Sequence, residues 1–188
     1  MTGPGKAPRR LDAASDALLA ERAGDGDTAA FEALARRHGP LMRAYARRLT
    51  GSLADADDAV QEALVRCWSQ LPALRDPAAV RGWMMRITAR CAINVLRRRK
   101  YDIALDEETR DDPGPGPESR AVTGSSMTAL GKALGRLPEA QRQCWVLRKM
   151  GGQSCEEIAR TLGISTESVR GRLARAQATL IKEMEAWR

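Results

Sequence analysis

Residues 154–175 read SCEEIARTLGISTESVRGRLAR, and this stretch predicts two short helices joined by a tight turn. Ser154 and Glu157 have the spacing of a capping box, in which each side chain accepts a hydrogen bond from the backbone of the other residue. Gly163 follows the last apolar residue of the first helix, where a left-handed residue without Cβ is favoured. Ser165 then caps the second helix. The pattern is that of a helix-turn-helix.

The second helix of this unit separates apolar from polar residues. Val169, Leu173 and Ala176 recur at helical spacing and form its expected buried side. The candidate DNA-binding residues on its other side are Ser165, Thr166, Ser168, Arg170, Gly171, Arg172 and Arg175. Hydroxyl and guanidinium groups bond to base edges and phosphates in the major groove, so the helix favours DNA binding. An ordinary helical hairpin with a solvated basic face is the alternative.

Length and composition agree with a small helical nucleic-acid-binding protein. The 188 residues fit one or two small domains. The 31 basic side chains exceed the 24 acidic ones by seven, and most are arginines, which suit phosphate and guanine. Valine and isoleucine are sparse and no segment alternates polar with apolar residues, so an all-α fold is expected.

The sequence gives no sign of membrane insertion or export. No apolar run approaches the roughly 18 residues that a membrane span needs. The first ten residues, MTGPGKAPRR, lack the apolar segment of a secretory signal. We therefore expect a cytoplasmic protein.

The cysteines do not indicate a metal site. Cys67, Cys91, Cys144 and Cys155 form no C-x-x-C pair, and the single histidine, His38, is remote from all of them in sequence. Buried free thiols are expected, with no metal, no cofactor and no catalytic residue. Two alternatives remain open. One is an enzyme such as a nuclease or a thiol-dependent catalyst, which needs clustered carboxylates or a histidine base near a cysteine. The other is a redox switch in which Cys144 and Cys155 form a disulfide.

The charge distribution divides the chain into domains. Residues 11–101 are predicted to form one helical domain and residues 125–188 a second, after a flexible tail at 1–10. Residues 1–101 carry a net charge of +7 and residues 125–188 a net charge of +5. The stretch 102–124 carries −5 and three prolines near glycines, a composition typical of a flexible linker.

Apolar periodicity and capping residues predict the helices. In the first domain, the first helix is predicted over 15–23. The second is capped by Asp27, breaks or kinks at Gly39-Pro40 and ends at Gly51. The third is capped by Asp55, and the fourth spans 78–100, after a proline-bounded loop. In the second domain, one helix is predicted over 127–137, and the next has Pro138 in its first turn and reaches 150. The helix-turn-helix follows, and its last helix runs from 165 to about 187.

Three segments resemble a known family. DADDAVQEALVRCW (55–68), RGWMMRITARCAINVLRRR (81–99) and LPEAQRQCWVLRKMGGQSCEEIARTLGISTESVRGRLARA (137–176) are similar to regions 2 and 4 of bacterial σ factors. Two such domains on a short linker resemble the extracytoplasmic-function group of the σ70 family. The resemblance implies a σ2-like helical bundle and a σ4-like helix-turn-helix domain. It also implies a non-enzymatic factor that gives core RNA polymerase its promoter specificity.

The resemblance also implies which residues contact each partner. The helix from Asp55 would dock on the β′ clamp helices of the polymerase, with Asp55, Asp58, Gln61, Glu62 and Arg66 as its contact residues. The proline-bounded loop and the fourth helix would read the −10 element, holding one DNA strand with an unstacked base in a pocket. The candidates there are Arg75, Asp76, Arg81, Trp83, Arg86, Arg90, Asn94, Arg97 and Arg98. The last helix would read the −35 element.

Further partners follow from the same resemblance. Residues 127–150 and the end of the last helix would contact the β flap of the polymerase, and an anti-σ protein would hold the factor inactive. Some positions depart from the family pattern: Met84 follows Trp83 where housekeeping σ factors have a second tryptophan, Arg90 replaces a frequent Asn, and Asn94 a frequent Asp. The −10 preference therefore stays undetermined. A stand-alone helix-turn-helix regulator is the alternative function, although it leaves the basic fourth helix unexplained.

Overall fold

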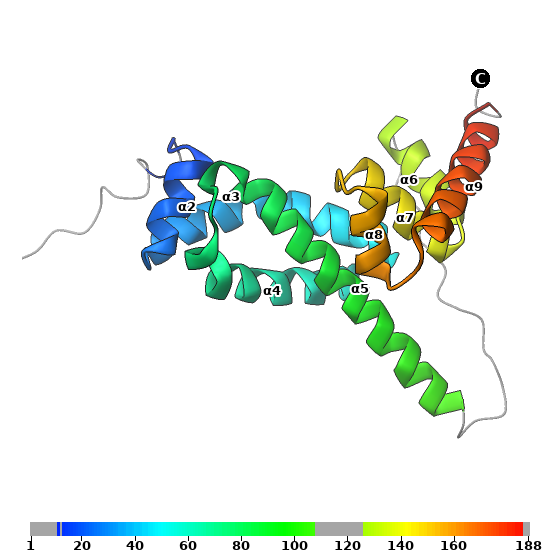
Figure 1. Ribbon diagram of the computed structural model, residues 1–188, viewed down its shortest axis with the longest axis horizontal. Coiled ribbons are helices and arrows are strands. Elements are labelled where there is room, and N and C mark those ends of the chain that lie inside the picture. The colour runs from blue at the N-terminus through cyan, green and yellow to red at the C-terminus, as the bar shows by residue number, and fades with distance from the viewer. Residues whose placement is uncertain (1–10, 12, 108–125, 186–188) are drawn as a thin grey trace, which may run out of the picture.

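The computed structural model describes residues 11, 13–107 and 126–185, and helices make up most of this part of the chain. No strand occurs among the described residues, so the expected all-α fold is confirmed. Figure 1 shows two groups of helices, α2–α5 at one end and α6–α9 at the other. We call them the N-terminal and the C-terminal domain. The predicted tail (1–10) and most of the predicted linker (108–124) lie outside the described residues.

In the N-terminal domain, α3 and α5 pack on each other and on α4, and α2 packs against α3. The bounds are α2 Asp16–Gly24, α3 Thr28–Thr50, α4 Leu53–Gln70, η1 Leu71–Ala73, η2 Pro77–Ala79 and α5 Val80–Glu107. Ser15 and Asp27 cap α2 and α3 by accepting from backbone amides, as their positions predicted.

α3 does not break at Gly39-Pro40, contrary to one of the two outcomes expected there. The helix runs through Pro40 without interruption. A residue before proline is normally driven out of the helical region because its Cβ and amide meet the proline ring. Gly39 has no Cβ, so this part of the clash with the Pro40 ring is absent. Glycine before the proline therefore lets α3 continue, at the expense of one backbone hydrogen bond.

The start of α4 also differs from the prediction. Its cap is Ser52, whose hydroxyl accepts from the Asp55 amide at 3.3 Å, and the helix begins at Leu53. Asp55 lies in the first turn, where its negative charge stabilises the positive end of the helix. Both residues are good caps, and the sequence signal for a boundary is uncertain by a few residues.

α5 is longer than the fourth helix expected from the sequence. It continues to Glu107, into the stretch assigned to the linker, and Figure 1 shows its C-terminal part projecting from the N-terminal domain. It is preceded by two 3-10 turns, η1 and η2. Asp76 caps η2 by accepting from the Ala78 amide at 3.1 Å.

In the C-terminal domain, α9 packs against α7, α8 and α6. The bounds are α6 Ser126–Arg136, α7 Glu139–Lys149, α8 Cys155–Leu162 and α9 Thr166–Glu185. Pro138 occupies the cap position of α7 rather than its first turn. Residues 186–188, which include the predicted end of the last helix, lie outside the described part.

The core is continuous between the two domains. One cluster of buried apolar residues includes Leu34 and Met84 from the N-terminal domain together with Leu147 and Ile158 from the C-terminal domain. A smaller cluster joins α6 to the second half of α9. The domains are thus in direct contact.

Candidate nucleic-acid and protein interfaces

The helix-turn-helix predicted from residues 154–175 is confirmed. The Ser154 hydroxyl accepts from the Glu157 amide at 3.1 Å, and the Glu157 carboxylate accepts from the Ser154 amide at 2.7 Å. Gly163 ends α8 with φ of +68°, a left-handed conformation that favours glycine. Its amide and that of Ile164 both donate to the Ala159 carbonyl. This geometry fixes the direction in which α9 leaves the turn.

The outer face of α9 is open to solvent. Ser165, Ser168, Arg170 and Arg175 are exposed, while Val169 and Ala176 on the inner face are buried. The Ser165 hydroxyl accepts from the Ser168 amide at 3.2 Å and donates to the Ser168 hydroxyl at 3.0 Å. It therefore helps to begin the helix. Arg170 and Arg175 remain as the long, exposed cations of this face.

Three other residues predicted on this face are less exposed than these arginines. Arg172 is half-buried and lies near Cys144 of α7: burial raises the pKa of the Cys144 thiol, and the Arg172 guanidinium opposes this rise. Gly171 is helical and half-buried, and a Cβ there would meet only the Arg175 guanidinium, at 3.7 Å. Thr166 is also half-buried.

The candidate −10 residues lie on the loop before η2 and on α5. Arg75, Arg81, Arg86 and Arg90 are exposed, and Asn94 is half-buried. Trp83 packs against the core, so its ring contributes to the fold. Asp76 caps η2, which gives its side chain a structural role.

A cavity of about 380 Å³ lies beside the proline-bounded loop. Backbone and side chains of α2 and of the loop line it, among them Glu21, Asp25, Leu71 and Leu74. The sequence did not indicate a contribution of α2 to this region, because contacts between distant segments leave no local pattern.

The basic stretch 97–100 of α5 is held by contacts within the chain. Arg97 donates to the Thr161 carbonyl of α8 at 3.2 Å. Arg98 lies 3.5 Å from the Glu62 carboxylate, and Arg99 donates to Asp55 at 3.0 Å. Two of the predicted DNA-binding arginines, Arg97 and Arg98, therefore already have partners in this arrangement.

The polar stripe predicted on α4 contains both exposed and paired residues. Asp58 and Gln61 are exposed, whereas Asp55, Glu62 and Arg66 are half-buried. Glu62 pairs with Arg66 at 2.5 Å, one helical turn away.

Val65 on the same helix is 70% exposed, although the sequence pattern did not predict it as a contact residue. Val65 follows Glu62 by three residues and Gln61 by four, so it lies on the same side of the helix. This spacing is the sequence feature that could have identified it. Trp68 near the end of α4 is 37% exposed, and its ring contacts the Phe31 ring.

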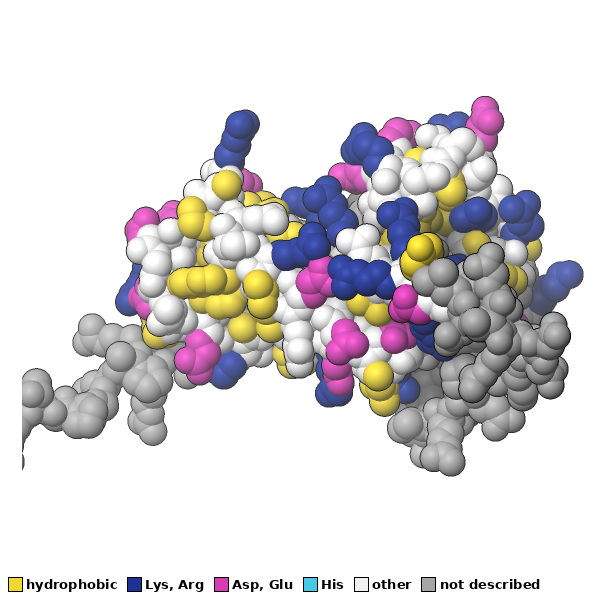
Figure 2. Space-filling view, turned by 90° about the horizontal axis from the view of Figure 1, so that it is seen from below, with side chains coloured by type: hydrophobic (Ala, Val, Ile, Leu, Met, Phe, Trp, Pro, Cys, Tyr) yellow, Lys and Arg dark blue, Asp and Glu magenta, His cyan; other side chains and the backbone are white. Residues whose placement is uncertain are grey.

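The distribution of side chains on one face agrees with this picture. Figure 2 shows Lys and Arg side chains gathered in the middle of the molecule, between the two domains, and hydrophobic side chains over the N-terminal domain. On this face the described part thus combines a basic central region with an apolar region over the N-terminal domain.

The histidine and the cysteines have structural surroundings. His38 is buried and hydrogen bonds to Asp16 at 2.9 Å, which ties α3 to α2. Although burial raises the pKa of Asp16, hydrogen bonds from Arg37 and His38 lower it overall. The four cysteines are free thiols; Cys155 is half-buried and the other three are buried, as expected. Burial raises the pKa of Cys67 to about 12.

In the described part of the chain, no group of three or more His, Cys, Asp or Glu side chains is arranged to hold a metal ion. Within the same residues, every helix is too short or too polar to traverse a bilayer.

Comparisons with known proteins agree with this architecture. Residues 34–101 match the family described as Sigma-70 region 2, and residues 127–180 match Sigma-70, region 4. The RNA polymerase sigma factor CnrH of Cupriavidus metallidurans is 30% identical over 183 residues, which cover 92% of this chain and 95% of that protein. The ECF RNA polymerase sigma factor SigM of Mycobacterium tuberculosis is 35% identical over 168 residues, covering 89% and 84%.

A solved structure is also similar. CnrH in complex with the cytosolic domain of CnrY has a TM-score of 0.54 and 29% identity, over 91% of this chain and 97% of that one. The chain therefore belongs to the σ70 family of RNA polymerase sigma factors, in its extracytoplasmic-function group. As a member of this group, it acts as a sigma factor in promoter-specific transcription initiation.

Proposed function

We propose that the chain docks on core RNA polymerase through the outer face of α4 and contacts the promoter at two separate elements. The observation that carries this proposal is the presence of two exposed arginine surfaces on different domains, one on α9 and one on α5 with its preceding loop. Two modules gain affinity when a larger partner fixes their spacing, so each alone binds DNA weakly. The polymerase supplies this spacing.

The −35 element is assigned to α9. The proposed contact residues are those predicted from the sequence, led by Arg170 and Arg175, because these cations extend from the exposed face of the helix. A bidentate arginine–guanine contact supplies about 1–3 kcal/mol of discrimination. Arg172, turned toward Cys144, is assigned to a phosphate at the edge of the groove.

The −10 element is assigned to the proline-bounded loop and α5. Arg75, Arg81, Arg86 and Arg90 would follow the backbone of one strand, as cations do in single-strand grooves. The cavity of about 380 Å³ beside the loop is large enough to take an unstacked base. Arg97 and Arg98 join this surface once their present partners release them.

The polymerase surface is assigned to α4, with Val65 added to the predicted residues. An exposed valine next to Asp58 and Gln61 provides an apolar centre with a polar rim, the usual anatomy of a protein interface. The β flap is assigned to the C-terminal domain, where Ile181 near the end of α9 is 49% exposed.

The remaining properties follow from the family. We infer a factor without catalytic activity of its own that works in the cytoplasm beside the polymerase. CnrH, the similar protein of known structure, was solved with the cytosolic domain of CnrY. By analogy, we propose that an anti-σ protein restrains this chain as well.

Run-off transcription tests the function. Core RNA polymerase with genomic fragments from the source organism should yield discrete transcripts only when this chain is added. Failure of the chain to co-elute with core polymerase in gel filtration would refute the proposal. Tight, sequence-specific binding to duplex DNA without polymerase would instead support the stand-alone regulator.

A further inference from the structure

A cleft of about 270 Å³ lies between α5 of the N-terminal domain and α8 of the C-terminal domain, two helices that contact each other. One wall carries two basic side chains of α5, and the other belongs to α8 and to the turn before it. The lining residues are Arg86, Arg90, Gln153, Glu157, Arg160 and Thr161. Basic side chains from two parts of the sequence therefore converge on one cleft.

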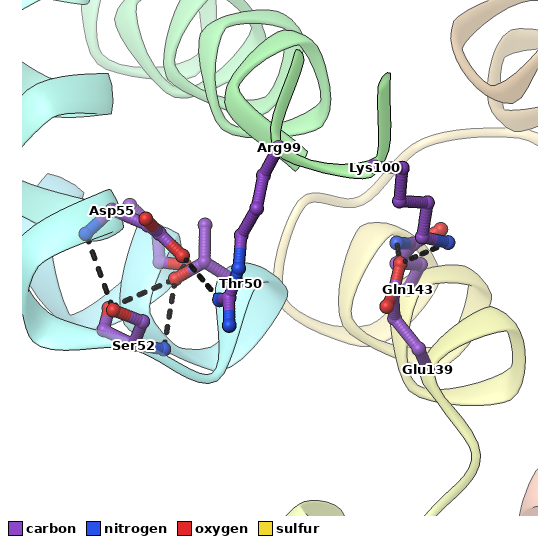
Figure 3. Close-up of polar contacts among 8 residues, drawn as sticks. Thr50, Ser52, Asp55, Arg99, Lys100, Glu139 and Gln143 are labelled. Atoms are coloured by element: carbon purple, nitrogen blue, oxygen red, sulfur yellow. Dashed lines mark hydrogen bonds and ion pairs between the residues drawn. The ribbon is translucent and has the colours of Figure 1, made fainter. Parts of the chain in front are cut away.

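Contacts within the chain hold the two walls in place. The Thr161 carbonyl accepts from the Arg97 guanidinium at 3.2 Å, which ties the end of α8 to α5. Lys100 of α5 pairs with Glu139 of α7 at 2.8 Å (Figure 3). Within α8, the Thr161 hydroxyl donates to the Glu157 carbonyl at 2.9 Å. The positions of the basic side chains at the cleft thus follow from the packing of α5 on α8.

The three cleft arginines, Arg86, Arg90 and Arg160, have unpaired charges. All three are exposed, and none of them forms a hydrogen bond or an ion pair with another residue in the described part of the chain. The arginines at 97–99 of α5, in contrast, each have a partner within the chain. The guanidinium donors of the cleft arginines are therefore available to a ligand.

The rest of the lining is polar and nearly without negative charge. Glu157 is the one acidic residue among the lining residues, and its carboxylate accepts from the Ser154 amide at 2.7 Å in the capping box of α8. Gln153, which is 4% exposed, and Thr161 add neutral hydrogen-bonding groups. None of the lining residues is apolar. Such a lining suits an anion with several oxygen acceptors and does not suit an apolar ligand.

We propose that this cleft binds a small multivalent phosphate, with Arg86 and Arg90 on one side of a diphosphate group and Arg160 on the other. Guanidinium groups match phosphate oxygens in bidentate pairs, and two linked phosphates can engage cations on both walls at once. The volume of about 270 Å³ lies just below the roughly 300–1,000 Å³ of sites for drug-sized ligands. A compact ion therefore fits better than a whole nucleotide.

The DNA backbone is the other possible source of phosphate for these arginines. Arg86 and Arg90 are already assigned to one strand of the −10 element, and that strand would follow α5. Arg160 belongs to α8 and to none of the proposed promoter contacts. A diphosphate held between the two walls needs Arg160, whereas a strand on α5 does not. Arg160 therefore distinguishes the two sources.

Calorimetric titration of the free full-length chain with sodium pyrophosphate, at constant ionic strength, tests the site. The chain should show saturable binding of one pyrophosphate. Arg160→Gln and Arg86→Gln should each weaken this binding about tenfold or more, as expected for the loss of a charged hydrogen bond. Arg47→Gln removes an exposed charge from α3, away from the cleft, and should change the affinity less than about twofold because salt screens distant charges. Absence of saturable binding, or equal losses in all three variants, would overturn the proposal.

A second titration, with a short single-stranded oligodeoxythymidine, separates the two sources of phosphate. Arg160→Gln should bind this oligonucleotide within about twofold of the unmodified chain. If Arg160→Gln instead loses oligonucleotide and pyrophosphate affinity to the same extent, the cleft serves the DNA backbone and the diphosphate site is wrong. Thermal unfolding confirms that each variant is folded, and pyrophosphate should raise the melting temperature of the unmodified chain more than that of Arg160→Gln. These measurements use no polymerase, so their outcome is independent of the proposed function.

Discussion

Arg99 donates a hydrogen bond to Asp55 at 3.0 Å and thereby joins the basic stretch 97–100 of α5 to the first turn of α4 (Figure 3). The Asp55 side chain is only 19% exposed, and the Asp55 amide donates to Ser52. Asp58, one turn further along α4, is exposed. Two carboxylates that the sequence assigned to one surface therefore have different surroundings.

Replacing these two carboxylates separately should separate stability from binding. Asp55→Ala should lower the free energy of unfolding by about 1 kcal/mol, because it removes the ion pair and a favourable charge at the helix start. Asp58→Ala should change stability by less than about 0.5 kcal/mol but weaken binding to core polymerase. Urea denaturation and titration of labelled polymerase measure the two effects. Equal behaviour of the variants in both assays would refute this distinction.

Gly171→Ala should stabilise the chain while impairing promoter use. A Cβ at this helical position meets only the end of the flexible Arg175 side chain, so the substitution should raise the free energy of unfolding by about 1 kcal/mol. If the DNA backbone approaches α9 closely at Gly171, the added methyl group should reduce transcription.

Gly131→Ala on α6 is the matched control for Gly171→Ala. Gly131 is exposed, with nothing within 4 Å of an added Cβ. The Gly131→Ala variant should be stabilised by a similar amount and should leave transcription unchanged. Loss of stability in the Gly171 variant would show that the site is tighter than the geometry indicates.

The sequence was most informative where structure is set by neighbouring residues. The capping box of Ser154 and Glu157, the left-handed Gly163 and the cap at Ser165 depend on positions a few residues apart, and all were predicted correctly. The start of α4 was misplaced because Ser52 and Asp55 are both suitable caps. Gly39-Pro40 predicted a break or a kink, and the break is absent because α3 continues through Pro40.

The contacts between distant segments could not be predicted in this way. The packing of Tyr45 against Gly151, and the pairs Arg97–Thr161 and Lys100–Glu139, join residues far apart in the sequence. No periodicity records such contacts. For the same reason the sequence pattern predicted basic residues on α5 without indicating that Arg97 and Lys100 contact the C-terminal domain.

Alkaline pH should destabilise the fold through a buried thiol. Burial raises the pKa of Cys67 from about 9 to about 12. The unfolded thiol therefore ionises first, so stability is fully present below about pH 9 and is lost as the pH rises toward 12. The contribution approaches about 1.4 kcal/mol per pH unit.

The Cys67→Ala variant isolates this contribution. Tyr45, whose pKa burial also raises, contributes equally in both proteins. Urea unfolding between about pH 8 and pH 10 should therefore give a shallower slope for the variant. Parallel slopes would mean that Cys67 is accessible to solvent.

Arg170→Ala should weaken promoter recognition without affecting the fold. Loss of one bidentate base contact corresponds to about 1–3 kcal/mol, or roughly a tenfold to hundredfold loss of affinity of the holoenzyme for the promoter. Arg47→Ala makes the same charge change at an exposed position of α3, outside the proposed surfaces, and should reduce binding far less. Gel-shift titrations at one fixed salt concentration provide the comparison. Similar losses in both variants would indicate a general effect of net charge.

Tyr45→Phe should stabilise the chain, which is the opposite of the usual result for a fully buried tyrosine. The Tyr45 hydroxyl is buried between the domains without a hydrogen-bond partner, so its removal should raise the free energy of unfolding by about 1 kcal/mol. Tyr101→Phe, at a position that is 67% exposed, should have no measurable effect. A destabilised Tyr45→Phe variant would show that the Tyr45 hydroxyl makes a hydrogen bond in solution, contrary to this prediction.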